Sequence, residues 1–221
     1  MGECVESCRF KEVILTCKHH DRFCLWPSAY TEHSIKNSPY KNGKGDMVNE
    51  VSMACKKEGV RFGIYLSPWD RNSAVYAKPE YISYYRDQLS ELITNYGPVS
   101  ELWFDGANGG IGYYGGANER CEISQDYYDW ANTVNLARSL QDDELVVFSD
   151  AGPDIRWVGN EQGWAGETNC YPMDPDSCLI RRPGYKKIIG AGMELGSDWI
   201  PSKVDVSIRP IGSIMSQKIP W

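Results

Sequence analysis

The sequence predicts an α/β protein in which residues 1–221 form one domain around a parallel sheet. Short apolar runs, which are typical of buried strands, alternate along the chain with longer segments of helical periodicity. Each apolar run is followed by a polar or glycine-rich loop. Strands that alternate with helices in this way favour βαβ crossovers, which join neighbouring parallel strands.

The strands are expected at these apolar runs: Val13–Cys17, Phe62–Leu66, Val99–Phe104, Leu145–Phe148 and Val204–Ile208. After the first run, Asp46 is a suitable N-cap for a helix that continues to about Lys57. After the second run, Pro79 opens a helix whose apolar positions follow the helical period as far as Gly97. A further helix is expected from about residue 125 to residue 140.

The loops after the strands carry most of the chemically active side chains, which favours a (β/α)8 barrel over a doubly wound sheet. These loops are Lys18–Asp21, Ser67–Asp70, Asp105–Gly106 and Ser149–Asp154. A complete barrel usually takes about 250 residues. We therefore expect a partial barrel of about five parallel strands with helices, lacking the first and last strands.

A glycine motif gives the doubly wound alternative its only support. The segment Gly110–Gly115 matches the dinucleotide-binding fingerprint. We reject the match because the glycines come well after the strand and no helix begins at Gly115. A mobile loop near the active-site cleft is expected there instead.

Composition excludes several classes of partner. The net charge is −7, from 30 acidic and 23 basic residues, which argues against binding to nucleic acid or to an anionic membrane. The cysteines form no Cys-x-x-Cys pair, so a structural zinc is not expected. Cys17 and Cys55 are expected to be buried thiols, and Cys170 and Cys178 are candidates for a disulfide in an oxidising compartment.

The segment Val99–Gly106 predicts a buried strand that ends on a carboxylate and a glycine. Asp105 therefore stands where the strand leaves the core, which is where catalytic groups lie in α/β folds. Trp103 points to the same side of the strand as Asp105, because side chains alternate along a strand. An indole beside a carboxylate suits a sugar ring. The alternative is a plain strand followed by an Asp-Gly turn.

The sequence His19-His20-Asp21 raises the question of a metal site. Adjacent residues on a strand face opposite ways, so two neighbouring histidines chelate poorly. Adding Asp21 and the distant His33 makes only a weak set of ligands. No metal is therefore expected.

Four strings that follow one another along the chain carry a resemblance to a known family. They are Leu15–Ser28, which contains the histidine pair and Leu-Trp-Pro-Ser, and then Gly63–Asp70, Glu101–Gly106 and Ser149–Glu161. Together they resemble the retaining α-L-fucosidases of glycoside hydrolase family 29, most closely the branch that acts on α-1,3/1,4-linked fucose. The resemblance implies a fucosylated oligosaccharide or glycoconjugate as substrate, no cofactor, and a secreted, periplasmic, lysosomal or vacuolar location.

The resemblance also assigns the two carboxylates of a retaining mechanism. Asp105 matches the nucleophile, and Glu161 matches the general acid/base, with Glu167 as the alternative acid. A retaining glycosidase needs its two carboxyl groups about 5–5.5 Å apart. Trp157 and Trp164 are expected to desolvate the Glu161 carboxyl, which favours the protonated form that an acid requires.

The resemblance further implies which residues bind the sugar. His19 and His20 match the pair that binds fucose hydroxyls, and neutral histidines can donate to such hydroxyls without a metal. The other substrate-binding candidates are Trp26, Tyr65, Trp103, Arg156 and Trp157.

The chain departs from the family pattern in three respects. Nothing in it matches the preceding strand with its fucose-binding histidine, the pattern breaks off after Pro210, and Arg22 stands where the family usually has glycine. We therefore expect an incomplete catalytic domain that is weakly active and marginally stable by itself. Two alternatives stay open: a non-catalytic fucose-binding remnant of such an enzyme, and a metal-dependent hydrolase that uses the histidine pair.

Overall fold

The computed structural model describes residues 10–105, 111–114, 119–124, 126–141, 144–149, 152–165, 170–174 and 185–206. The chain divides into two compact units, Met1–Phe148 and Ser149–Trp221. Each unit has a hydrophobic cluster of its own among the described residues.

The first unit is built on neighbouring strands in the order β1 (Glu12–Lys18), β2 (Arg61–Leu66), β3 (Glu101–Phe104) and β6 (Val146–Ser149). β1 pairs in parallel with β2, and β2 pairs in parallel with β3, so that Tyr65 lies beside Trp103. β6 follows β3, and the amide of Val146 donates to the carbonyl of Ser100 at 3.1 Å. The α/β class and the first four predicted strands are thus confirmed.

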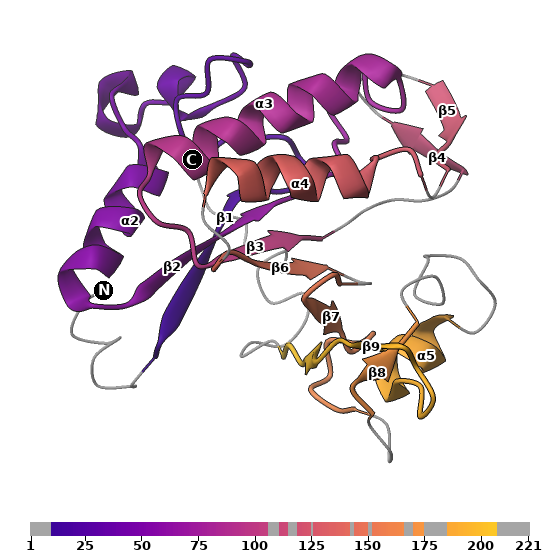
Figure 1. Ribbon diagram of the computed structural model, residues 1–221. Helices are drawn as coiled ribbons and strands as arrows, with labels where there is room; N and C mark the ends of the chain where they lie inside the picture. Colours follow the sequence, from indigo (N-terminus) through magenta and orange to yellow (C-terminus); the bar gives the residue numbers. More distant parts are fainter. Residues whose placement is uncertain are drawn as a thin grey trace. The chain divides into compact units, whose positions relative to one another are not determined.

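Helices α2 (Met47–Glu58), α3 (Pro79–Asn95) and α4 (Trp130–Leu140) belong to this unit, as do the short 3-10 turns η1 (Ile35–Asn37) and η2 (Tyr40–Gly43). In Figure 1, α3 and α4 lie side by side along the sheet, and α2 packs on β1 and β2. Asp46 caps α2 by accepting from the amide of Asn49 at 2.9 Å. The helix starts predicted at Asp46 and Pro79 are confirmed, whereas α4 begins at Trp130 because a turn occupies residues 126–128.

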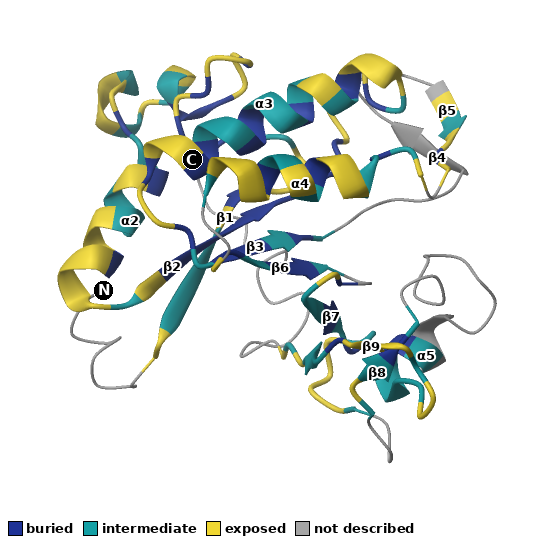
Figure 2. Cartoon of the chain, viewed as in Figure 1, coloured by how far each residue is buried: buried dark blue, intermediate teal, exposed yellow. Residues whose placement is uncertain are grey.

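Aromatic side chains of α3 form much of the core of the first unit. Tyr81 and Tyr85 lie one helical turn apart and are 0% and 2% exposed. The hydroxyl of Tyr85 donates to the carbonyl of Leu66 at 2.9 Å, which ties the helix to the end of β2. Figure 2 shows the buried residues concentrated along the strands and on parts of α3. The core therefore supports the strand ends from which the loops emerge.

A hairpin follows β3 in the first unit. Its strands β4 (Ile111–Tyr114) and β5 (Glu119–Glu122) pair antiparallel. The loop expected over Gly110–Gly115 is corrected here, because Gly112 lies in β4 and pairs with Cys121 of β5. Residues 110 and 115 lie outside the described residues.

The second unit contains β7 (Ile155–Trp157), β8 (Pro172–Met173), α5 (Tyr185–Ala191), β9 (Asp198–Trp199) and β10 (Ser202–Lys203). β7 pairs in parallel with β10, and β8 pairs antiparallel with β9. A small cluster of Met173, Ile189 and Ile200 forms its core.

Two features of the second unit differ from the prediction. The sequence did not reveal β7, because a three-residue strand is too short to show periodicity. The strand expected at 204–208 lies instead at Ser202–Lys203, where it pairs with β7, and Val206 forms only an isolated bridge with Gln162. Residues 207 and 208 lie outside the described residues.

Candidate active site

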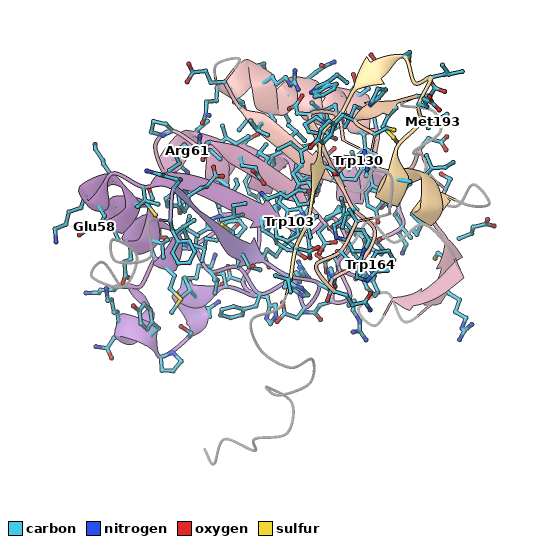
Figure 3. The ribbon with its side chains drawn as sticks, turned by 90° about the horizontal axis from the view of Figure 1, so that it is seen from below. Glu58, Arg61, Trp103, Trp130, Trp164 and Met193 are labelled. Atoms are coloured by element: carbon cyan, nitrogen blue, oxygen red, sulfur yellow. The ribbon has the colours of Figure 1, made fainter. Side chains whose placement is uncertain are left out.

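Three neighbouring strand ends of the first unit bring the predicted site residues together. β1 leads into His19 and His20, β2 carries Tyr65, and β3 carries Trp103 and ends before Asp105. The parallel register places Tyr65 beside Trp103, so the ends of β2 and β3 are level. Trp103 is labelled in Figure 3. The shared edge of the strands thus gathers these residues from segments that are far apart in the sequence.

The carboxylate of Asp105 is held by its neighbour on the adjacent strand. The hydroxyl of Tyr65 donates to Oδ2 of Asp105 at 2.9 Å. The indole of Trp103 meets the Tyr65 ring edge-on, with ring centroids 5.2 Å apart, and also packs against Phe148 at 5.0 Å. A charge-assisted hydrogen bond from a ring that is itself held by packing fixes the direction of the carboxylate.

The histidine pair lies against the same tyrosine. The ring of His19 stacks on Tyr65 with centroids 5.6 Å apart and planes 1° from parallel. The rings of His19 and His20 are 4.0 Å apart. Nδ1 of His20 lies 2.7 Å from the hydroxyl oxygen of Ser67. One cluster therefore brings together five of the candidate site residues: His19, His20, Tyr65, Trp103 and Asp105.

His20 is neutral at neutral pH. Burial is the main cause and, with the neighbouring charge of His19, lowers the pKa of His20 from 6.5 to about 4. Asp105 acts in the opposite direction but does not outweigh burial. The site therefore holds an uncharged imidazole beside a carboxylate, which is an arrangement for hydrogen bonding to a polar, uncharged ligand.

A buried ionic network lies beside the end of β1, and the sequence did not indicate it. Lys18 is fully buried, and its Nζ donates to Oε1 of Gln88 at 2.9 Å and lies 4.0 Å from Oδ2 of Asp70. Burial lowers the pKa of Lys18 and raises that of Asp70. Nζ also lies within 5.9 Å of three tyrosine ring centroids, those of Tyr81, Tyr84 and Tyr85. The only sequence signal was a lysine at the end of an apolar strand.

Arg22, noted as standing in place of a glycine, belongs to the same network. Its backbone has a φ of 72°, in the left-handed region that favours glycine. The side chain offsets this strain, because Nε donates to the hydroxyl of Tyr84 at 3.1 Å and lies 3.7 Å from Oδ2 of Asp70. The arginine therefore links the loop after β1 to the loop after β2.

In the second unit, Glu161 stands in an exposed turn after β7. Trp157 is half-buried and donates through Nε1 to Oδ1 of Asp205 at 2.6 Å, and Trp164 is 59% exposed. Within this unit the two indoles do not desolvate Glu161, so that part of the expectation is not confirmed. Glu167, the alternative acid, lies outside the described residues. The separation of the Asp105 and Glu161 carboxyl groups stays a prediction.

Two predicted substrate-binding residues, Arg156 and Trp26, make buried hydrogen bonds within their own units. Arg156 is 0% exposed, and its guanidinium donates to the backbone carbonyls of Cys170 at 2.7 Å, Ile200 at 3.2 Å and Ile189. Trp26 is 1% exposed, and its Nε1 donates to Oε2 of Glu91 on α3 at 2.9 Å. These interactions give both side chains a structural role, and their contact with substrate stays a prediction.

The described part of the chain also bears on metals, thiols and membranes. Its His, Cys, Asp and Glu side chains form no group of three or more that could hold a metal ion. Cys17 and Cys55 are buried free thiols, as predicted. Cys170 is a free thiol as well, and Cys178 lies outside the described residues. None of the described helices combines the length and the apolar character needed to cross a membrane.

Comparison with known proteins gives consistent matches. The family model for alpha-L-fucosidase matches residues 4–178. Alpha-L-fucosidase 1 of Arabidopsis thaliana is 44% identical over 204 residues, which are 91% of this chain and 37% of that protein. Putative alpha-L-fucosidase 1 of Oryza sativa subsp. japonica is 44% identical over 91% of this chain and 36% of its own length. The chain thus spans little more than a third of these curated relatives.

Solved structures agree with these matches. A glycoside hydrolase 29 family member from an unknown rumen bacterium has a TM-score of 0.84 and 47% identity, over 95% of this chain and 37% of its own. A GH29 fucosidase from Ruminococcus gnavus, solved in complex with fucose, has a TM-score of 0.71 and 31% identity, over 92% of this chain and 44% of its own.

Proposed function

This chain belongs to the alpha-L-fucosidase family, and on that premise we propose that it carries the catalytic machinery of a retaining glycoside hydrolase. The reaction is release of α-L-fucose from fucosylated oligosaccharides or glycoconjugates through a covalent glycosyl-enzyme intermediate. The relatives named α-L-fucosidases and the fucose complex of the Ruminococcus gnavus enzyme support this substrate. The sequence resemblance further favours α-1,3/1,4-linked fucose.

The observation that carries the proposal is the hydrogen bond from Tyr65 to Asp105, within a cluster of aromatic rings and imidazoles. We assign attack on the anomeric carbon to Oδ1 of Asp105, because Tyr65 holds Oδ2. An indole and two imidazoles beside a carboxylate offer a sugar both an apolar face and polar partners for its hydroxyls. The histidine pair and Trp103 are therefore the proposed sugar-binding residues of the first unit.

Glu161 is the proposed general acid/base, and Glu167 is its rival. The position of Glu161 at the end of the Arg-Trp-Val-Gly-Asn-Glu string supports the assignment. The mechanism then requires the Glu161 and Asp105 carboxyl groups to be about 5–5.5 Å apart, so that one attacks while the other protonates the leaving oxygen. Trp157 precedes Glu161 and is retained as a proposed substrate contact.

Turnover of 4-nitrophenyl α-L-fucoside tests the proposal, with NMR of the first-formed sugar to determine its anomeric configuration. We expect fucose to be released with its α configuration retained, and the Asp105→Asn variant to be at least about 10³-fold slower. Inversion at the anomeric carbon, or an Asn variant with near-normal turnover, would contradict the mechanism.

The second candidate is a fucose-binding chain without turnover. Calorimetric titration with fucose distinguishes the two, because binding without any turnover would support this candidate. A metal chelator should leave turnover unchanged, whereas its loss would favour the metal-dependent alternative.

A further inference from the structure

The hydroxyl of Ser67 stands between two partners that compete for its proton. Ser67 is fully buried at the end of β2. Its Oγ lies 2.9 Å from the carbonyl oxygen of Trp69 and 2.7 Å from Nδ1 of His20. A serine hydroxyl has one hydrogen to donate and lone pairs with which to accept. Only one of the two partners can therefore receive that hydrogen.

Counting protons decides which partner receives it. The Trp69 carbonyl oxygen can only accept, so the hydroxyl donates to it. Toward His20, the Ser67 oxygen then presents only its lone pairs. A hydrogen bond at 2.7 Å therefore requires that Nδ1 of His20 carries a hydrogen and donates it to Ser67. The reverse arrangement would place the carbonyl oxygen against a serine lone pair in a buried position, which is unfavourable.

The charge state of the ring determines what remains at Nε2. Burial, His19 and Arg71 disfavour the protonated ring, and they outweigh Asp105 and Asp21, which favour it. A neutral imidazole carries a single N–H. With that hydrogen on Nδ1, Nε2 has only a lone pair.

We propose that Ser67 is a positioning residue that locks His20 in its Nδ1-protonated form, so that Nε2 accepts a hydrogen bond from a substrate hydroxyl. His20 is then an acceptor in substrate binding, and not the donor that the sequence suggested. The site therefore selects for a sugar hydroxyl that can donate at this position. The identity of the sugar rests on the proposed function, but the protonation of the ring does not.

The ring protonation is tested directly by ¹⁵N NMR of the chain labelled at histidine. The chain has three histidines, and the His20→Gln variant assigns the signals. We expect His20 to show the Nδ1–H form at neutral pH. An Nε2–H form or a charged ring would overturn the proposal. Because this readout needs neither substrate nor turnover, it is independent of whether the chain is a fucosidase.

Substitution of the serine tests its role. Ser67→Ala removes the acceptor for Nδ1–H, so we expect the two neutral forms of His20 to mix and KM to rise about tenfold, with a smaller change in kcat. Ser34→Ala is the matched control, because Ser34 is 1% exposed and its hydroxyl has no partner among the described residues. Ser67→Thr, which keeps the hydroxyl, should restore the Nδ1–H signal. An unchanged His20 spectrum in a folded Ser67→Ala protein would overturn the role of Ser67.

Substrate analogues test the acceptor in the unmodified protein, where folding is not in question. In a series of deoxyfluoro fucosides, fluorine replaces one hydroxyl at a time and cannot donate a hydrogen bond. The analogue with fluorine at the position that faces Nε2 should bind about tenfold more weakly than the parent sugar. Deoxyfluoro fucosides that all bind like the parent would contradict an accepting Nε2. Where Ser67→Ala folds, the penalty at that one position should shrink.

Discussion

The two proposed catalytic carboxylates lie in surroundings of opposite kinds. Asp105 is held by Tyr65, whose ring packs against Trp103 and His19, and Trp103 packs in turn against Phe148. Glu161 stands in an exposed turn of the second unit, and the indole of Trp164, three residues further on, is 59% exposed. The nucleophile is therefore oriented by its own unit, whereas the acid is not desolvated within its own unit. This difference allows their substitutions to be distinguished.

The largest effect is expected at Glu161, where a substitution should change the rate of the reaction and leave the stability of the fold unchanged. Glu161→Ala should slow substrates with poor leaving groups by about 10²–10⁴-fold, since those need protonation. Added azide should partly restore turnover of activated aryl fucosides. Stability should not change, because the side chain is exposed.

Two further variants make this result decisive. Glu194→Ala, another exposed glutamate of the same unit, is the matched control and should have normal kinetics. If Glu167→Ala shows azide rescue and Glu161→Ala does not, the acid is Glu167.

Substitutions in the buried network beside β1 should lower the stability of the fold, in contrast to Glu161→Ala. Asp70→Asn leaves the buried Lys18 ammonium without its counter-ion and should lower the free energy of unfolding by about 3 kcal/mol. Urea unfolding measures this loss. Adding Lys18→Met to Asp70→Asn should recover part of the loss.

An exposed pair provides the control for this prediction. Lys41 and Glu50 approach to 2.8 Å on the surface, and Glu50→Gln should leave the urea midpoint unchanged. Equal losses in Asp70→Asn and Glu50→Gln would show that burial of the pair is not what matters.

Substitution of Arg156 should lower the stability of the second unit. Arg156→Met would leave the carbonyls of Cys170, Ile189 and Ile200 without this donor, at a cost of about 2 kcal/mol. Hydrogen exchange should then speed up in β7 and α5 but not in β1 to β3. Arg61→Gln, at an arginine that is 67% exposed, is the control and should leave exchange in both units unchanged. Faster exchange confined to the first unit would contradict the structural role of Arg156.

The last effect is the pH dependence of stability that His20 contributes. Its pKa is about 4 when folded and 6.5 in the unfolded chain, so the unfolded chain binds the proton first as the pH falls. His20 therefore lowers stability progressively between pH 6.5 and about 4, and the contribution above pH 6.5 is constant. Thermal unfolding of the wild type and of His20→Gln should show the wild type losing more stability across this window. Parallel curves would contradict the shifted pKa.

Much of the fold could be predicted because its signals are local. The apolar runs identified β1, β2, β3 and β6, and the cap at Asp46 and the proline at Pro79 identified two helix starts. The same runs led to Asp105, because a carboxylate directly after a buried strand has to stand at the strand end. The motif strings then indicated the family, which the family model bears out.

The roles of the buried polar residues could be assigned only from the folded arrangement of the chain. Lys18 finds its acceptor 70 residues away on α3, and Trp26 finds its own acceptor 65 residues away on the same helix. Arg156 meets carbonyls from segments up to 44 residues distant. Short strands such as β7 and β10 likewise exist only through their partner. The physical reason is the same in each case, because a polar group can be buried only when a distant segment supplies its hydrogen bonds.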